Sequence, residues 1–342
     1  MMIKVREYAV MIRNGVLALA LLLTGCAHLE LVNEDRYYPE IDWISDLQYD
    51  PDEIKPMTFS ATGCPQISVA LNGKPFWLKF DFGCSKGFQL TTAVESQLDY
   101  IVLRETNTYN TDGTVRGRVK RIRLDSLEVF GERYDDLEGT LADWKIFSSL
   151  PYQGLISLEY FADYRFTQDY KRGRLALTKK PFPDALKGSS RYLLTDILDP
   201  PDWHKYGVYV LGKVNGIDSV IYIDNGSSKT DVDYRILSDA QKAKSDGKNC
   251  SAEVPISIGD LEFAIRNFRI RKIERGTDYQ YPVRIKIGSD LLKRFVITID
   301  RTENRNILII HKNRLARRRE RIDGSFLPGI SPDQPNLSSI QG

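Results

Sequence analysis

Two aspartate residues stand in matching sequence contexts, 143 positions apart. Asp81 lies in the segment LNGKPFWLKFDFG at 71–83, and Asp224 lies in the segment VNGIDSVIYIDNG at 214–226. In both segments an Asn-Gly pair and an apolar stretch lead into Asp-x-Gly. If the two carboxylates meet, they share one proton, so one can activate a water while the other polarises a carbonyl. Such a pair can hydrolyse a peptide bond without a metal ion or a nucleophilic side chain.

Short β-hairpins are predicted to position both aspartates. The Asn-Gly pairs at 72–73 and 215–216 favour tight turns because both residue types accept positive φ angles. Alternating apolar residues on either side predict strands, so the hairpins should cover 67–81 and 208–224. A repeat of this size indicates two copies of one lobe, since solenoid repeats are only about 20–50 residues long.

The rest of the chain shows many short strand patterns separated by turn signals, which predicts an all-β protein. Proline residues and a Gly-Ser-Ser segment near residue 185 predict a linker between the two halves. A basic run followed by a Pro/Ser/Asn-rich stretch predicts a disordered tail. The expected domains are a signal peptide at 1–26, an extended lead-in or spacer at 27–58, a first lobe at 59–180, a linker at 181–200, a second lobe at 201–312 and a basic tail at 313–342.

The N-terminus carries an export signal pattern. Arg13 precedes an apolar run at 16–23, which is shorter than the roughly 20 residues that a transmembrane helix needs. A basic start, a short apolar core and small residues are typical of a secretory signal. The ending Leu-Thr-Gly-Cys resembles the lipobox of bacterial lipoproteins, which implies a lipid on Cys26 and a membrane-anchored protein of the bacterial cell envelope. An ordinary signal peptide with a chance cysteine, or a buried helix, is the alternative.

Composition narrows the partners and cofactors. With 48 Lys and Arg against 46 Asp and Glu, the net charge of +2 gives no reason to expect nucleic acid. The chain has three histidines and no zinc-ligand spacing, so we expect no metal and no other cofactor. We expect His204 to lie on the surface. Cys64 and Cys84 flank the first hairpin and are a possible disulfide.

Over about residues 60–312 the sequence resembles the aspartic peptidases, in particular the bacterial retropepsin-like group. Asp81-Phe82-Gly83-Cys84 and Asp224-Asn225-Gly226-Ser227 stand where that family has Asp-Thr-Gly-Ser/Ala. The resemblance implies two pseudo-symmetric pepsin-like or retropepsin-like β-barrel lobes with a cleft between them and a few short helices. It also implies that Asp81 and Asp224 are the catalytic residues, and that a peptide or protein occupies the cleft.

Further matches with the family lie downstream in each lobe. The segment Ile287-Gly288 corresponds to a glycine that packs behind the active aspartate, and Ile156-Ser157 takes that place in the first lobe. Residues 166–169 align with 297–300 as closing strands. Residues 104–118 are the flap candidate of the first lobe, and 242–253 are its shorter counterpart. The supporting residues implied by the resemblance are Gly83, Gly226, Ser227, Asn225 and Gly288.

Several departures from the family pattern keep two functions open. Phe82 cannot supply the hydrogen bonds of the family threonine, Asn225 can do so in part, and Lys286 replaces an apolar residue. One hypothesis is a membrane-anchored aspartic endopeptidase that cleaves peptides or envelope proteins. The other is an inactive pseudopeptidase that binds an extended peptide or protein partner in the cleft. A third and weaker reading is an assembly lipoprotein that uses only its outer surface.

Overall fold

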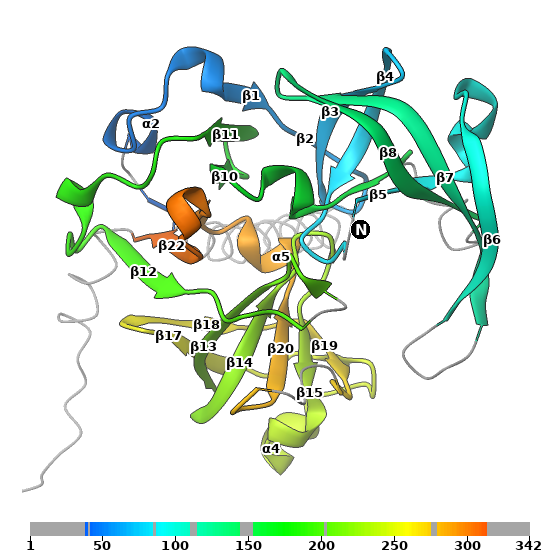
Figure 1. The fold of residues 1–342 in the computed structure, drawn as a ribbon. Coiled ribbons are helices and arrows are strands. Elements are labelled where there is room, and N and C mark those ends of the chain that lie inside the picture. Colours follow the sequence, from blue (N-terminus) through cyan, green and yellow to red (C-terminus); the bar gives the residue numbers. More distant parts are fainter. Residues whose placement is uncertain are drawn as a thin grey trace, which may run out of the picture.

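The computed structural model describes residues 38–39, 42–84, 87–109, 115–143, 153–201, 204–274 and 279–312. The expected signal peptide, Cys26 and the tail at 313–342 lie outside these residues. The described chain is predominantly β, as the sequence predicts, with three sheets and only short helices (Figure 1). None of the helices in this part of the chain is long and apolar enough to cross a membrane.

The first eight-stranded sheet contains the hairpin that leads to Asp81. Asn72 and Gly73 have φ angles of 48° and 74°, so the Asn-Gly turn forms as predicted. The Asn72 side chain also accepts the Ser126 N–H and donates to the Asp99 carbonyl, which ties the turn to the rest of the sheet. In spatial order the strands are β2 (Thr58–Phe59), β3 (Pro65–Leu71), β4 (Lys74–Phe80), β9 (Gly154–Ile156), β5 (Phe88–Thr91), β8 (Glu132–Asp143), β7 (Val115–Val129) and β6 (Ile101–Tyr109).

The second eight-stranded sheet contains the hairpin that leads to Asp224. Asn215 and Gly216 repeat the turn, with φ angles of 55° and 79°, and Asn215 donates to the Ile236 carbonyl. In spatial order the strands are β16 (Asn249–Cys250), β19 (Phe268–Arg271), β15 (Asp231–Asp233), β20 (Val283–Ile287), β14 (Ile217–Ile223), β13 (Val208–Val214), β17 (Val254–Ile258) and β18 (Leu261–Ile265).

A six-stranded sheet joins the closing strands of both halves, on the left of Figure 1. Its two central strands are antiparallel, and Thr167 lies opposite Thr298 at the middle of their register. The two threonine hydroxyls are 2.6 Å apart. In spatial order the strands are β1 (Ile54–Pro56), β11 (Arg174–Thr178), β10 (Arg165–Asp169), β21 (Val296–Asp300), β22 (Ile307–His311) and β12 (Tyr192–Asp196).

The described part of the lead-in is not an extended spacer. Helix α2 (Trp43–Asp46) and the residues around it cover one face of the six-stranded sheet. Trp43 is 1% exposed, and its indole N–H and the Tyr38 hydroxyl both donate to the buried Asp169 carboxylate. Strand β1 then pairs with β11 inside the sheet. The lead-in folds because its aromatic residues bury apolar area against strands more than 100 residues away.

The expected linker at 181–200 also belongs partly to the core. It includes β12, which pairs with β22 along its whole length. The closing strands of both expected lobes therefore lie in one shared sheet.

The other short helices are η2 (Pro51–Glu53), η3 (Thr92–Gln97), η4 (Leu158–Phe161), η5 (Asp184–Leu186), η7 (Tyr234–Ile236), α4 (Asp239–Lys242), α5 (Ser289–Leu292) and η8 (Thr302–Asn304).

The flap candidate at 104–118 falls on the hairpin formed by β6 and β7. Arg104 pairs with Arg121 and Tyr109 with Val115, so the two arms are antiparallel. Residues 110–114, including Gly113, lie outside the described residues. The counterpart at 242–253 is a compact turn between α4 and β17, with only the two-residue strand β16 inside it.

Candidate active site

Both aspartates follow the end of a strand that a parallel neighbour supports. Strand β4 lies parallel to β9, and the Asp81 N–H donates to the Ile156 carbonyl at 3.0 Å. Strand β14 lies parallel to β20, and the Asp224 N–H donates to the Ile287 carbonyl at 2.9 Å. The same backbone construction therefore holds both carboxylates, although they come from different sheets.

The two Asp-x-Gly loops touch each other. A Cβ atom built on Gly226 would lie 1.8 Å from Asp81 Oδ1, and one built on Gly83 would lie 2.7 Å from Asp224 Oδ1. The Gly83 position is also 3.0 Å from Asp81 Oδ1, so the two Oδ1 atoms can be no more than 5.7 Å apart. Each glycine thus makes room for the aspartate of the opposite loop.

This contact explains why glycine stands at positions 83 and 226. A glycine two residues after an aspartate can allow a sharp turn, yet neither Gly83 nor Gly226 has a positive φ angle. Any side chain at these positions would instead collide with a carboxylate. The requirement is therefore close approach between two loops, which sequence spacing cannot show.

The oxygens of each carboxylate have separate partners. Asp81 Oδ1 accepts the Gly83 N–H at 2.7 Å, and Asp224 Oδ1 accepts the N–H groups of Gly226 and Ser227, both at 3.1 Å. The Oδ2 atoms face lysines: Lys79 Nζ lies 3.2 Å from Asp81 and Lys286 Nζ lies 3.5 Å from Asp224. In both halves, backbone amides hold Oδ1 and an ammonium group lies beside Oδ2.

Lys79 is the more buried of the two lysines. It is 5% exposed and also donates to the Gly226 carbonyl at 2.7 Å, so it links the two loops. Asp81 itself is 6% exposed. Sequence reasoning missed Lys79, although the signal was present. Residues two apart in a strand share a face, so a lysine two positions before Asp81 should point to the same side.

Lys286 belongs to a larger charged network. Its ammonium lies 3.0 Å from Asp231 Oδ2, and Asp231 is also held by the Arg269 guanidinium at 2.6 Å. The lysine comes from β20, the neighbour of the strand that leads to Asp224. Lys79 thus lies on the strand that leads to its own aspartate, whereas Lys286 lies on the neighbouring strand.

The residues between Asp and Gly make one hydrogen bond across the loops. Asn225 Oδ1 accepts the Phe82 N–H at 2.7 Å, and both residues are fully buried. Asn225 thus supplies part of the cross-loop bonding that the resemblance leads us to expect of threonine. The Phe82 ring packs edge-on against Phe80 and Phe166, at centroid distances of 5.5 and 5.8 Å.

His204 is not on the surface, and the prediction for it is wrong. It is 1% exposed, and its Nε2 atom lies 2.9 Å from the Phe82 carbonyl oxygen. Because a carbonyl can only accept, Nε2 carries the proton, and Nδ1 accepts from the Tyr209 hydroxyl at 2.7 Å. His204 therefore ties the start of the second half to the Asp81 loop.

No disulfide joins Cys64 and Cys84, and both remain buried thiols. Cys64 Sγ lies 3.3 Å from the carbonyl oxygen of Gly226, so its side chain faces the opposite loop. Burial raises the pKa of the Cys64 thiol, although the Lys79 charge opposes this shift. The possible disulfide predicted from the sequence is therefore not formed.

The remaining supporting residues lie behind the Asp224 loop. Ser227 retains its hydroxyl, but it donates to the Lys229 carbonyl at 2.8 Å. A Cβ on Gly288 would lie 2.6 Å from the Lys229 backbone, so this glycine is required for close packing. In the first half Ser157 takes the corresponding place and accepts the Glu159 N–H.

Comparison with known proteins adds no identification. No protein-family model matches the chain, and no curated protein matches it in sequence.

Proposed function

We propose that the protein is an aspartic peptidase-like hydrolase in which Asp81 and Asp224 act together on a peptide bond. The observation that supports this most is the mutual contact of the two Asp-x-Gly loops. It brings one carboxylate from each sheet into a single site, with the Oδ1 atoms at most 5.7 Å apart. A water held between these atoms could be activated by one carboxylate while the other, protonated, polarises the substrate carbonyl.

The surrounding groups would position this pair. Backbone N–H groups hold each Oδ1 atom, and Lys79 and Lys286 face the Oδ2 atoms. The cross-loop bond from Phe82 to Asn225 and the His204 bond to Phe82 restrain the loops. Such restraint matters because a displacement of about 1 Å can cost roughly 100-fold in rate.

The architecture supports a pepsin-like arrangement of two lobes. Each eight-stranded sheet carries an Asn-Gly hairpin, an aspartate after the second arm and a parallel strand beside it. The six-stranded sheet pairs the closing strands of the two halves around Thr167 and Thr298. We also propose that the protein is an envelope lipoprotein anchored through Cys26, which rests on the sequence pattern alone.

A peptide-binding pseudopeptidase is the second candidate, and the lysines favour it. An ammonium beside each carboxylate stabilises the charged pair, whereas hydrolysis needs one member to carry a proton. In this case an extended peptide or a protein partner would bind at the loops without being cut.

Digestion of an unfolded polypeptide by the purified full chain tests the proposal. We expect Asp81→Asn and Asp224→Asn each to lower the cleavage rate by about 10²–10⁴-fold, as for loss of a general acid or base. Equal rates in both variants and the unaltered chain would rule out this site. Absence of cleavage together with saturable peptide binding that both variants weaken would favour the pseudopeptidase.

A further inference from the structure

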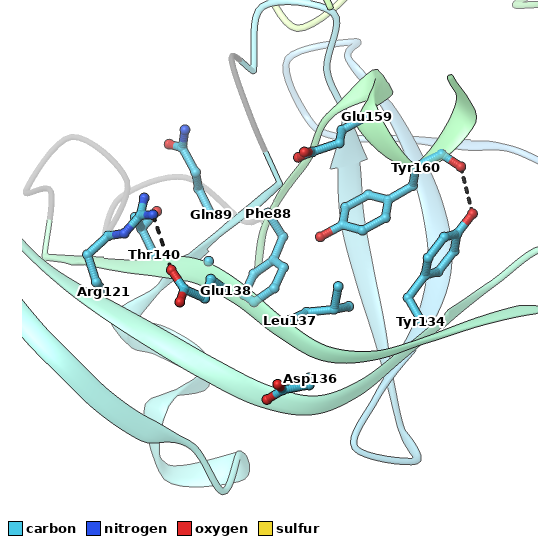
Figure 2. Close-up of a pocket in the computed structure, with 11 residues that line it drawn as sticks. Phe88, Gln89, Arg121, Tyr134, Asp136, Leu137, Glu138, Thr140, Glu159 and Tyr160 are labelled. Atoms are coloured by element: carbon cyan, nitrogen blue, oxygen red, sulfur yellow. Dashed lines mark hydrogen bonds and ion pairs between the residues drawn. The ribbon is translucent and has the colours of Figure 1, made fainter. Parts of the chain in front are cut away.

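A pocket of about 620 Å³ lies in the first eight-stranded sheet, beside helix η4 (Figure 2). Its wall includes Phe88, Tyr134 and Tyr160, with Arg121, Glu138 and Glu159 among the charged groups. The predicted function does not involve these side chains. The residues that line the pocket therefore do not include Asp81 or Asp224.

Most of the charge around the pocket is already paired. Arg121 lies 3.5 Å from Glu138, and Arg123 lies 3.4 Å from Asp136 and 3.7 Å from Glu138. These two arginines balance the two carboxylates. Glu159 differs, because no ion pair to it is found within the described residues. It accepts the Gly87 N–H at 2.5 Å. In the described part of the chain, the Glu159 carboxylate is thus the wall carboxylate that has no arginine or lysine beside it.

The Tyr160 hydroxyl is a second possible acceptor in the pocket wall. Tyr160 is 7% exposed and lines the pocket, yet no hydrogen bond to its hydroxyl is found in the described part of the chain. Its backbone carbonyl accepts the Tyr134 hydroxyl at 2.8 Å, which fixes the local backbone. Burial raises the pKa of Tyr160, so the phenol stays neutral and can accept a hydrogen bond.

Glu159 and Tyr160 direct their oxygens to the same region (Figure 2). A Cβ built on Gly87 would lie 3.7 Å from Glu159 Oε2, 3.8 Å from the Tyr160 hydroxyl and 3.2 Å from the Glu138 carbonyl oxygen. Three oxygens therefore face the space beside Gly87, which has no side chain to fill it. This arrangement suits a group that donates several hydrogen bonds and carries positive charge.

The wall favours an organic cation. Phe88, Tyr134 and Tyr160 supply aromatic surface, with the two tyrosine ring centroids 5.1 Å apart. Aromatic faces attract guanidinium and ammonium groups, and arginine most often. No group of three or more His, Cys, Asp or Glu side chains suited to a metal ion occurs among the described residues.

We propose that this pocket binds the guanidinium group of an arginine side chain presented by a polypeptide, with Glu159 and the Tyr160 hydroxyl as its acceptors. The aromatic wall would pack against the arginine stem and the guanidinium plane. The proposal does not depend on Asp81 or Asp224, so it stands or falls separately from hydrolysis.

A matched pair of tripeptides tests the proposal. Blocked Ala-Arg-Ala and blocked Ala-citrulline-Ala have side chains of nearly the same shape, but only arginine is charged. We expect NMR titration of the full chain to show saturable binding of the arginine peptide, at least about tenfold tighter than that of the citrulline peptide. The shifted resonances should include those of Glu159 and Tyr160.

Two variants and one control sharpen the result. Glu159→Gln can still accept the Gly87 N–H, yet it should lower arginine affinity about tenfold and remove the preference over citrulline. Tyr160→Phe keeps the ring and should weaken binding a few fold. Glu253→Gln, just before β17, should bind as the unaltered chain does. Equal binding of both peptides, or the same loss in Glu253→Gln, would overturn the proposal.

Discussion

The Asp81 loop and the Asp224 loop have the same backbone but different side-chain support. In both, the aspartate N–H bonds to a parallel strand and Oδ1 accepts the N–H of the glycine two residues on. The side chains diverge. Lys79 comes from the strand that leads to Asp81, whereas Lys286 comes from the strand beside Asp224. Phe82 packs in an apolar core, whereas Asn225 bonds across to the other loop.

This difference shows which features the two loops share and which they do not. Backbone hydrogen bonds depend on the path of the chain and tolerate many side chains. A charge beside a carboxylate depends only on where an ammonium group ends up, so either neighbouring strand can provide it. The two loops share the path of the backbone and differ in the side chains that support it.

The largest loss of stability is expected from substitution of the two glycines, and it should be greater for Gly226 than for Gly83. Gly226→Ala would place a methyl group 1.8 Å from Asp81 Oδ1, and Gly83→Ala would place one 2.7 Å from Asp224 Oδ1. We expect Gly226→Ala to lower the free energy of unfolding by about 4 kcal/mol and Gly83→Ala by about 2 kcal/mol. Urea denaturation measures both. Equal losses would mean that the loops approach each other symmetrically.

The next largest difference in stability is expected between variants of the two lysines. Lys79→Met leaves Asp81 buried without its partner, and we expect a loss of about 3 kcal/mol in unfolding free energy. Lys286 has a 24% exposed side chain, so solvent screens its charge, and Lys286→Met should cost about 1 kcal/mol. Combining Lys79→Met with Asp81→Asn removes both buried charges and should recover most of the first loss. A double variant as unstable as Lys79→Met would contradict the charge argument.

Two titratable residues at the centre of the six-stranded sheet should make the stability of the protein depend on pH. Thr167 is bonded to the Tyr49 hydroxyl at 2.9 Å, and Thr298 to His311 Nε2 at 2.8 Å. Burial lowers the pKa of His311 from 6.5 to about 3, so the folded protein keeps this residue neutral. Between these values the unfolded chain binds a proton that the folded chain does not, and stability falls as pH falls.

We expect the His311 effect to reach about 2 kcal/mol at pH 5 relative to pH 7.5. Burial instead raises the pKa of Tyr49 above its ordinary value of 10.0. The neutral Tyr49 side chain therefore lowers the stability of the fold only as the pH rises through the alkaline range. Urea denaturation at both acidic and neutral pH, with His311→Gln as control, measures the difference. An equal acid loss in His311→Gln would assign it to other groups.

A further, modest effect is expected from the hydrogen bond between the two loops. Asn225→Ala removes the acceptor of the buried Phe82 N–H, and we expect a loss of about 1.5 kcal/mol in unfolding free energy. Asn225→Thr offers a hydroxyl acceptor and should lose less. Thermal denaturation compares the two variants. If threonine is no better than alanine, the acceptor at this position does not stabilise the loops.

Local features could be predicted and distant contacts could not. The Asn-Gly turns and the strands before both aspartates follow from φ preferences and alternation within a few residues. Trp43 gave no such signal, because its partner Asp169 lies 126 residues away. His204 was misplaced for the same reason, since it bonds to Phe82, 122 residues earlier.

The sequence by itself determined the all-β character, the two hairpins and the position of each aspartate after a strand. These depend on backbone preferences and side-chain periodicity, which act between near neighbours. Only the tertiary structure decided that the glycines make room for opposite carboxylates and that Lys79 and Lys286 lie beside them. Charge pairing and close approach depend on distances between segments, and those distances exist only once the sheets have packed.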